Sequence, residues 1–273
     1  MNVTVIDASK KPGFSLRKIW EVRELLYFFA LRDIILRYRY TLLGILWILF
    51  QPVVLTFIFA GIFGSFSQQF SMKIPYIPFT FIGLLYWNYF VSSLQKSSTA
   101  LLLNQSLVTK VPFPKIALPL SGIFVGFIDF FLAFVLFIVV SFFFHIPPTP
   151  LGILMIVPTL LICMFTTLGL GLLFSVLQVQ YRDARNVLPF FTTVFFFLTP
   201  VFYTSKIVFP PTYRWIQYFF NPLTGAIEGI RGVWFGEPIH ATLLLFSVVG
   251  SLTILFIGIV SFTKYEQKLV DTL

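Results

Sequence analysis

The chain has 273 residues and few charges: hydrophobic residues make up 58% and charged residues only 11%. A soluble globular domain averages roughly a quarter charged residues, so an ordinary soluble domain is excluded. Because a spanning helix needs roughly 20 apolar residues, the length accommodates about six spans. The composition predicts an all-α integral membrane protein with six transmembrane helices.

The first region, residues 1–41, is predicted to be a cytoplasmic tail followed by an amphipathic interfacial helix. Its start has no apolar stretch of the kind that a cleaved signal peptide contains. Ser15 is a candidate helix cap, and apolar residues recur at helical spacing to about Ala30. Arg17 and Arg23 lie among them, which is typical of a helix in a membrane interface. A helix that packs on a partner protein is a compatible alternative.

A six-helix transmembrane domain, residues 42–262, is predicted next, and a cytoplasmic C-terminal tail, 263–273, follows it. The predicted spans cover residues 42–64, 76–98, 117–144, 151–178, 187–204 and 241–262. Glycines suited to close helix approach are Gly61 and Gly64 in the first span and Gly169 and Gly171 in the fourth.

Lysine and arginine residues are distributed unevenly between the two sides of the predicted topology. With both ends inside, 15 of the 19 fall in cytoplasmic segments: eight before the first span, three at the second connection (Lys96 at its edge, Lys110 and Lys115), two before the fifth span and two at the end. Because cytoplasmic loops carry the excess of basic residues, both termini are predicted to face the cytoplasm. The net charge of +9 is explained in the same way and does not indicate nucleic-acid binding. The basic residues outside this set are Lys73, Lys206, Arg214 and Arg231.

The longest predicted cytoplasmic connection runs from Ser97 to Pro119. It contains a possible short helix, Leu101 to Leu107, that Pro112 and Pro114 end. A basic, proline-stiffened segment suits contact with another protein, and a simple connector is the alternative. Together with Arg17 and Arg23, the candidate contact residues are Leu107, Lys110, Val111, Pro112, Phe113 and Lys115.

After the fifth span come two apolar segments that are too short to cross a bilayer, Tyr213–Phe220 and Gly225–Gly236. Segments of this length are typical of re-entrant or interfacial structure, and a re-entrant backbone needs a protein or water-filled surrounding. We therefore expect a hairpin that dips back toward a pathway, with two helices lying flat on the outer surface as the alternative. Glu228 and Arg231, three residues apart, are expected to pair on one helix face. The candidate gate residues of this hairpin are Tyr213, Trp215, Asn221, Pro222, Glu228 and Arg231.

Aromatic residues make up 19% of the chain. Tyr and Trp favour membrane interfaces, so those predicted inside spans are candidates for lining a pathway for an amphipathic substrate such as sugar rings. Packing between helices is the alternative. The pathway candidates are Trp47, Tyr86, Trp87, Tyr89, Phe195 and Tyr203.

Motifs for catalysis and metal binding are missing from the sequence. It has no phosphate-binding loop and no nucleophile elbow or zinc-protease motif. His145 and His240 lack neighbouring ligands at metal spacing, and Cys163 lies in an apolar run. We expect neither an enzyme nor a cofactor or metal bound by this chain.

Asp129 is the one carboxylate predicted in the middle of the membrane. An intramembrane acid is costly and is a functional candidate by default. A proton-coupled carrier would use it, but no second intramembrane ionisable residue is predicted as its relay partner. A protonated or hydrogen-bonded structural Asp129 is favoured.

Several stretches resemble the permease subunits of type-2 ABC exporters that move O-antigen, capsule and wall teichoic acid. They are ILRYRYTLLGILWILFQPVVLTFIFAGIFG at the first span, YRDARNVLPFF before the fifth, LTPVFYT, and FNPLTGAIEGIRGVWFG. The resemblance runs from about Ile19 to Lys268. The matched positions are Arg182 and Asp183 in the cytoplasmic turn, Pro200, Tyr203, Asn221 and Pro222.

This resemblance implies a homodimer in a bacterial inner membrane, joined to two copies of a separate ATPase that would bind ATP and Mg. The interfacial helix and the Ser97–Pro119 connection would dock on the ATPase. A lipid-linked glycan would pass along a path lined by the first, second and fifth spans. The alternatives are a type-2 permease for a drug, haem or lipid, and the Asp129 carrier.

Overall fold

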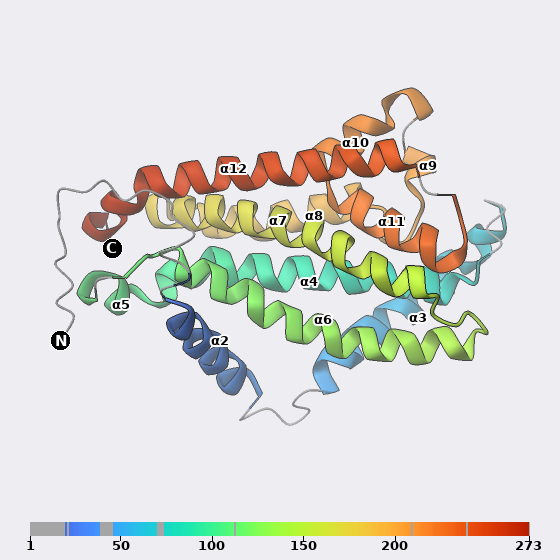
Figure 1. Cartoon of the computed structure of the whole chain (residues 1–273), viewed down its shortest axis with the longest axis horizontal. Coiled ribbons are helices and arrows are strands. Elements are labelled where there is room, and N and C mark those ends of the chain that lie inside the picture. Colours follow the sequence, from blue (N-terminus) through green and yellow to red (C-terminus); the bar gives the residue numbers. More distant parts are fainter. Residues whose placement is uncertain are drawn as a thin grey trace.

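The computed structural model describes residues 20, 22–38, 46–69, 74–111, 113–208, 210–238 and 240–272. Throughout these residues the regular structure is helical and no strand occurs, which confirms the all-α prediction. The long helices lie side by side along one axis (Figure 1). We refer to the end that holds the 105–110 helix and the last turns of the C-terminal helix as the α5 end. The opposite end, with the 144–149 turn and the 205–208 helix, is the α9 end.

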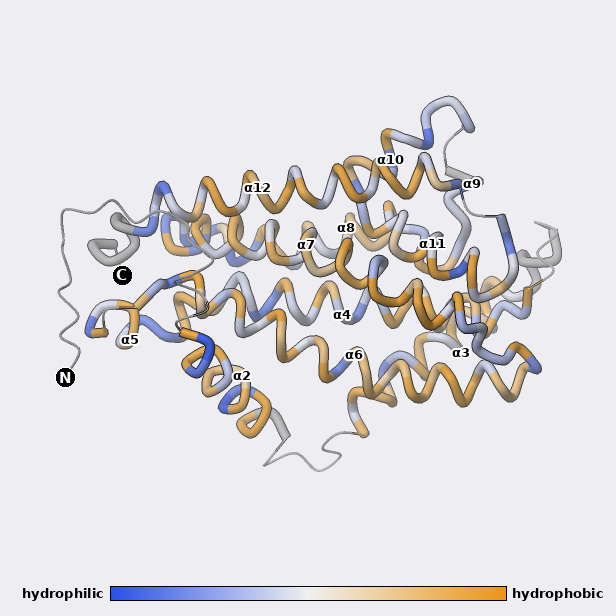
Figure 2. Tube along the Cα trace, viewed as in Figure 1, coloured by the Kyte–Doolittle hydropathy of each residue, from blue (hydrophilic) through white to orange (hydrophobic). Residues whose placement is uncertain are grey.

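Five of the described helices are long and apolar enough to cross a membrane. Each coincides with a span predicted from the sequence, and Figure 2 shows apolar residues along most of their length. They are α3 (Leu46–Gln69), α4 (Tyr76–Leu103), α6 (Ala117–Phe143), α7 (Pro150–Gln180) and α12 (Ala241–Thr272).

The fifth predicted span, 187–204, is wrong in its extent. The helix found there, α8 (Ala184–Leu198), has 15 residues. At 1.5 Å per residue it is about 22 Å long, shorter than the roughly 30 Å of a bilayer core. It ends before Thr199 and Pro200, because proline lacks the N–H that the next helical bond requires. Six full spans are therefore not confirmed.

Short helices occupy the remaining connections. The helix α2 (Arg23–Tyr38) extends beyond the predicted end near Ala30, and the candidate cap Ser15 lies outside the described residues. The others are α5 (Gln105–Lys110), α9 (Ser205–Val208), η1 (Pro211–Tyr213), α10 (Arg214–Phe220) and α11 (Leu223–Phe235).

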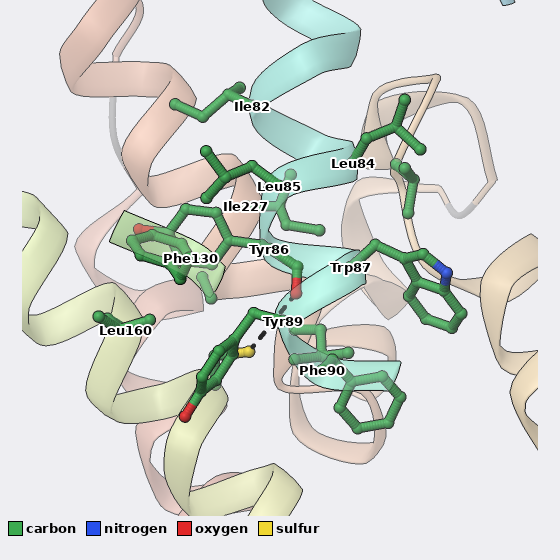
Figure 3. Close-up of a cluster of buried hydrophobic side chains, with 14 of the residues drawn as sticks. Ile82, Leu84, Leu85, Tyr86, Trp87, Tyr89, Phe90, Phe130, Leu160 and Ile227 are labelled. Atoms are coloured by element: carbon green, nitrogen blue, oxygen red, sulfur yellow. Dashed lines mark hydrogen bonds between the residues drawn. The ribbon is translucent and has the colours of Figure 1, made fainter. Parts of the chain in front are cut away.

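The helix α4 lies at the centre of the bundle. In its most apolar window 78% of the residues are buried, against 11% for α3 and 22% for α12. Its aromatic side chains pack with those of α6, α7, α8 and α11 in one core, part of which Figure 3 shows. The interior of the protein is therefore built around α4, while α3 and α12 leave most of their surface uncovered.

Close contact between α7 and α12 depends on two glycines, Gly169 and Gly258. A Cβ atom on Gly169 would lie 2.6 Å from the carbonyl oxygen of Ile254, and one on Gly258 would meet the backbone of Gly169. The predicted close approach at Gly169 is confirmed. At Gly61 and Gly64 of α3 a Cβ would meet nothing within 4 Å in the described chain, so no such contact forms there.

The two short segments after α8 have different surroundings. Eleven of the thirteen residues of α11 are buried, and the helix contacts α4, α7 and α12. Its Trp234 donates a hydrogen bond of 2.9 Å to the hydroxyl of Ser141 on α6. In contrast, α10 packs on α12 and leaves Tyr213, Trp215 and Phe220 exposed beside it. The bundle encloses α11, so two helices lying flat on the outer surface do not describe this region.

Candidate functional site

The connection 199–204, between α8 and α9, contains no helix and is nevertheless buried in part. Thr199 and Val201 are fully buried, although such a connection has few backbone hydrogen bonds of its own. Because buried backbone groups need partners, side chains from other elements supply them. We call this connection, with the residues of α4, α10 and α11 that bind it, the loop–hairpin junction.

Arg231 of α11 is the main donor in the junction. Its buried guanidinium donates to the carbonyl oxygens of Phe79 (2.9 and 3.1 Å), Pro200 (2.6 Å) and Tyr203 (3.2 Å), and to that of Val201. The guanidinium carbon lies 3.7 Å from the centre of the Phe79 ring. A planar guanidinium with five N–H donors suits this task, since it reaches several carbonyls at once. Arg231 therefore joins the start of α4, the 200–203 backbone and α11.

Glu228, one turn before Arg231, balances its charge. The two side chains lie 3.5 Å apart, which confirms the predicted pair, and only 4% of the Arg231 side chain is exposed. Glu228 also accepts hydrogen bonds of 3.4 Å from the backbone N–H and the hydroxyl of Ser205. Burial raises the pKa of the Glu228 carboxyl above its usual value, and Arg231 opposes this shift. The Glu228–Arg231 pair thus binds α9 as well as the 199–204 connection.

Two amide side chains complete the junction. Asn221, in the turn between α10 and α11, donates 2.9 Å to the hydroxyl of Thr199. Gln217 of α10 donates 3.2 Å to the carbonyl of Leu198 at the end of α8. Pro222 directly precedes α11, and Tyr203 donates 2.7 Å to the carbonyl of Phe197. Of the predicted gate residues, Asn221, Pro222, Glu228 and Arg231 come together here.

Tyr213 and Trp215 do not join this group. They are 53% and 42% exposed on the outer side of the hairpin, where Trp215 packs near Phe246 of α12. The structure brings together the polar members of the predicted gate and leaves these aromatic members at the surface.

The pathway candidates do not share one surface in this chain. Tyr86, Trp87 and Tyr89 on α4 are buried in the core (Figure 3). Phe195 on α8 is buried in the same core. Tyr86 shares a hydrogen bond of 2.7 Å with Thr159 and packs against Phe130. By contrast, Trp47 is 54% exposed on α3, and Tyr203 lies in the junction. Their role in a pathway stays a prediction.

Asp129 has an ionisable neighbour that the sequence analysis missed. The amino group of Lys96 on α4 lies 3.4 Å from its carboxylate, and both residues lie within spanning helices. The expectation that no second ionisable residue lies at this depth is therefore wrong. Lys96 was counted with the cytoplasmic connection because it lies at the edge of the predicted span 76–98, whereas the helix continues to Leu103.

The α5 end presents a second candidate surface. Val108 of α5 is buried in an apolar cluster with residues of α2, α4, α6, α7 and α12, while Leu103, Lys110 and Val111 are exposed. Leu107 and Phe113 are half-buried at its margin. The surface therefore has a packed inner face and an exposed outer face.

Polar contacts hold this surface to the rest of the chain. The backbone N–H of Lys115 donates 3.0 Å to the carboxylate of Glu266 on α12, and its amino group donates 3.2 Å to the carbonyl of Val111. Burial lowers the pKa of the Lys115 amino group, and Glu266 opposes this shift. Arg32 of α2 donates 2.9 Å to Asn104. We call residues 103–115 and these partners the α5 surface.

Arg23 and the turn residues Arg182 and Asp183 are exposed at the α5 end. The turn separates α7 from α8 and therefore lies at the same end as α5. Arg17 and Pro112 lie outside the described residues. No group of three or more metal-ligating side chains occurs in the part of the chain that the structure describes.

The bundle of long apolar helices defines a helical integral membrane protein. A sequence model of the family "ABC-2 type transporter" matches residues 24–235, and the chain belongs to this family. It is a membrane transport subunit.

Curated relatives match over most of their length. An O-antigen export system permease protein RfbA of Myxococcus xanthus is 28% identical over 233 residues, 83% of this chain and 88% of the relative. A protein of the same name from Klebsiella pneumoniae is 25% identical over 252 residues, 92% and 95% of the two chains. The polysialic acid transport protein KpsM of Escherichia coli is 25% identical over 271 residues, 96% and 99%.

Proposed function

We propose that this chain is the permease subunit of an ATP-driven exporter that moves a lipid-linked polysaccharide out of the cytoplasm. The observation that carries the proposal is its similarity, over 83–96% of its length, to permeases and transport proteins whose names specify O-antigen and polysialic acid. The substrate is of the O-antigen, capsule or teichoic acid type. An intramembrane proton carrier based on Asp129 has no support from the family.

In this proposal the chain acts as a homodimer in the bacterial inner membrane, with both termini in the cytoplasm. The α5 end is then the cytoplasmic end, which agrees with the distribution of basic residues. Only 11% of the residues in the most apolar stretch of α3 are buried, so this helix leaves a long face for a second copy of the chain and for lipid.

A separate ATPase docks on the α5 surface and binds ATP and Mg. The exposed Leu103, Lys110 and Val111 offer apolar and basic contacts. Beneath them, Val108 and the bond from Lys115 to Glu266 connect this surface to the bundle. Movement of the ATPase thereby reaches the spanning helices through packed side chains rather than through a flexible linker.

The loop–hairpin junction is proposed as the outer gate. Arg231 and Glu228 hold α4, α9, α11 and the 199–204 connection together, so opening on this side requires their contacts to be exchanged. A pathway for glycan is proposed along α3, α4 and α8.

The test combines purification with export. The tagged chain is purified in gentle detergent from native membranes, and a deletion strain with and without the restored gene is stained for surface glycan. We expect a soluble protein with a phosphate-binding loop to co-purify in equal amount, and the gene to restore the glycan. Reproducible absence of an ATPase would contradict the ABC assignment. An ATPase without any change in glycan would favour the drug, haem or lipid alternative.

A further inference from the structure

A cavity of about 210 Å³ lies between α3, α4 and α6, away from both ends of the bundle. It is bordered by residues near the midpoints of α4 and α6 and by the first turns of α3. It is separate from the loop–hairpin junction and from the α5 surface. Because it lies within the spanning helices, polar residues in its lining are not expected.

Five polar side chains line this cavity, in helices that are long and apolar enough to cross a membrane. Three follow one another along a face of α4 at intervals of four and three residues, so they project to the same side. One comes from α3 and one from α6. They are Asn88, Ser92, Gln95, Gln51 and Asp129.

Two amide side chains of this set make no hydrogen bond within the described residues. In the described part of the chain no side-chain hydrogen bond involves Gln51 or Asn88, although each offers donors and acceptors. Asp129 has Lys96 at 3.4 Å as its charge partner. Polar residues inside membrane spans are rare, and they generally mark a substrate pathway or face a water-filled cavity.

The lining also limits what can bind. The charge of Asp129 is already balanced by Lys96, so the lining offers no unpaired charge to an ionic ligand, and five polar groups disfavour an acyl chain. Amides and hydroxyls both donate and accept hydrogen bonds, which matches a ligand rich in hydroxyl groups. The rings of Tyr89 and Phe130 form an apolar wall, against which the face of a sugar ring can pack. The volume is below the roughly 300 Å³ at which sites for drug-sized ligands begin, so it suits a single ring.

We propose that this cavity binds one sugar unit of the exported glycan through its hydroxyl groups, inside the membrane. The inference rests on the proposed function, because only an exporter of glycan would bring a carbohydrate into contact with the spanning helices. It assigns α6 a direct contact with substrate in addition to the proposed pathway helices.

Photo-crosslinking in the intact exporter tests the proposal. A photoreactive phenylalanine analogue is placed at Gln51, which is exposed and lines the cavity. The matched control carries it at Phe131 of α6, which is 56% exposed and is not part of the lining. Cells that make the glycan are labelled with a radioactive hexose, irradiated, and the permease–ATPase complex is purified. We expect a labelled adduct at position 51 that is at least tenfold stronger than at position 131.

A second variant relates the adduct to the polar lining. Asn88→Leu, combined with the crosslinker at Gln51, is expected to weaken the labelled adduct about threefold to tenfold, the factor that one lost hydrogen bond represents. Phe131→Leu in the same background should leave the adduct unchanged. An adduct that Asn88→Leu does not weaken would overturn the role of the polar lining.

The outcomes separate this inference from the proposed function. Adducts at Gln51 that contain phospholipid and no sugar, or no adduct while the wild-type gene restores surface glycan, would overturn the cavity proposal alone. Failure of the wild-type gene to restore surface glycan would overturn the proposed function and the cavity proposal with it.

Discussion

Arg231 donates two hydrogen bonds, of 2.9 and 3.1 Å, to the backbone carbonyl of Phe79, a residue 152 positions earlier in the chain. The same guanidinium packs on the ring of Phe79. Three further bonds reach the 200–203 backbone, and one reaches the carboxylate of Glu228. One buried cation thus fixes α11 against the start of α4, and any relative movement of these helices must replace its bonds.

Replacing Arg231 with Met should therefore destabilise the protein strongly. The substitution keeps much of the side-chain length but leaves Glu228 buried without its counter-charge, which typically costs about 3–5 kcal/mol. Arg231→Lys should cost less, because it keeps the charge and loses the forked geometry. The measurement is thermal unfolding of the purified complex in detergent.

Arg185→Met, at an exposed position in the first turn of α8, is the matched control for this series. It should leave the unfolding temperature nearly unchanged. If Arg231→Met behaved like Arg185→Met, the guanidinium bonds would not contribute to stability.

Replacing Glu228 with Ala should loosen the loop–hairpin junction. The change removes the acceptor of both Ser205 bonds and the charge partner of Arg231. If the junction closes the outer side of the permease, Glu228→Ala should make resting membranes leaky to small solutes. Uptake of a dye into cells measures this leak. Glu228→Gln should leak less, because its amide retains an acceptor for Ser205.

Glu237→Ala provides the control for the leak. Glu237 pairs with Lys206 at 3.5 Å, but both side chains are nearly half exposed, and such surface pairs contribute about 0–1 kcal/mol. No leak is expected from this variant. If all three variants were present at normal levels and none increased dye uptake, the result would contradict a gating role for the junction.

The sequence alone was sufficient for the features that depend on neighbours in the chain. Hydrophobic runs located five long helices, and the spacing of Glu228 and Arg231 predicted their pair. Close helix approach was predicted at Gly169 and at Gly61 alike, but of these two only Gly169 has another helix within contact distance among the described residues. A glycine pattern shows where approach is possible, and the packing partner decides whether it occurs.

Features that depend on segments distant in the sequence were missed, because the residues that pack together cannot be read from local sequence. Nothing local to Lys96 indicates that Asp129, 33 residues later, lies beside it. The carbonyl partners of Arg231 were equally hidden, because backbone acceptors leave no residue-type signal. The aromatic residues of α4 fitted both a pathway and a packed core in the sequence, and in this chain they are buried.

Replacing Glu266 with Ala should weaken coupling between the ATPase and the spanning helices. The backbone N–H of Lys115 loses its acceptor, and an unsatisfied buried donor costs about 1–3 kcal/mol. Less export per ATP hydrolysed is expected in reconstituted vesicles, and a Gly-Ser linker in place of residues 111–115 should uncouple the two more completely. Lys264→Ala, at an exposed position two residues away, should keep normal coupling. Normal coupling in all three would place the docking surface elsewhere.

Replacing Gly169 with Ala should separate α7 from α12. The added methyl group would lie 2.6 Å from the carbonyl oxygen of Ile254, where the atoms in its way are backbone and cannot rotate aside. Overpacking of this kind costs typically about 1–3 kcal/mol, so the unfolding temperature in detergent should fall. Gly61→Ala is the matched control, because no atom of the described residues lies within 4 Å of the added methyl group, and alanine favours a helix over glycine by about 1 kcal/mol. The two variants should therefore shift stability in opposite directions, and a shift of the same sign and size in both would show that the α7–α12 contact is not limited by backbone approach.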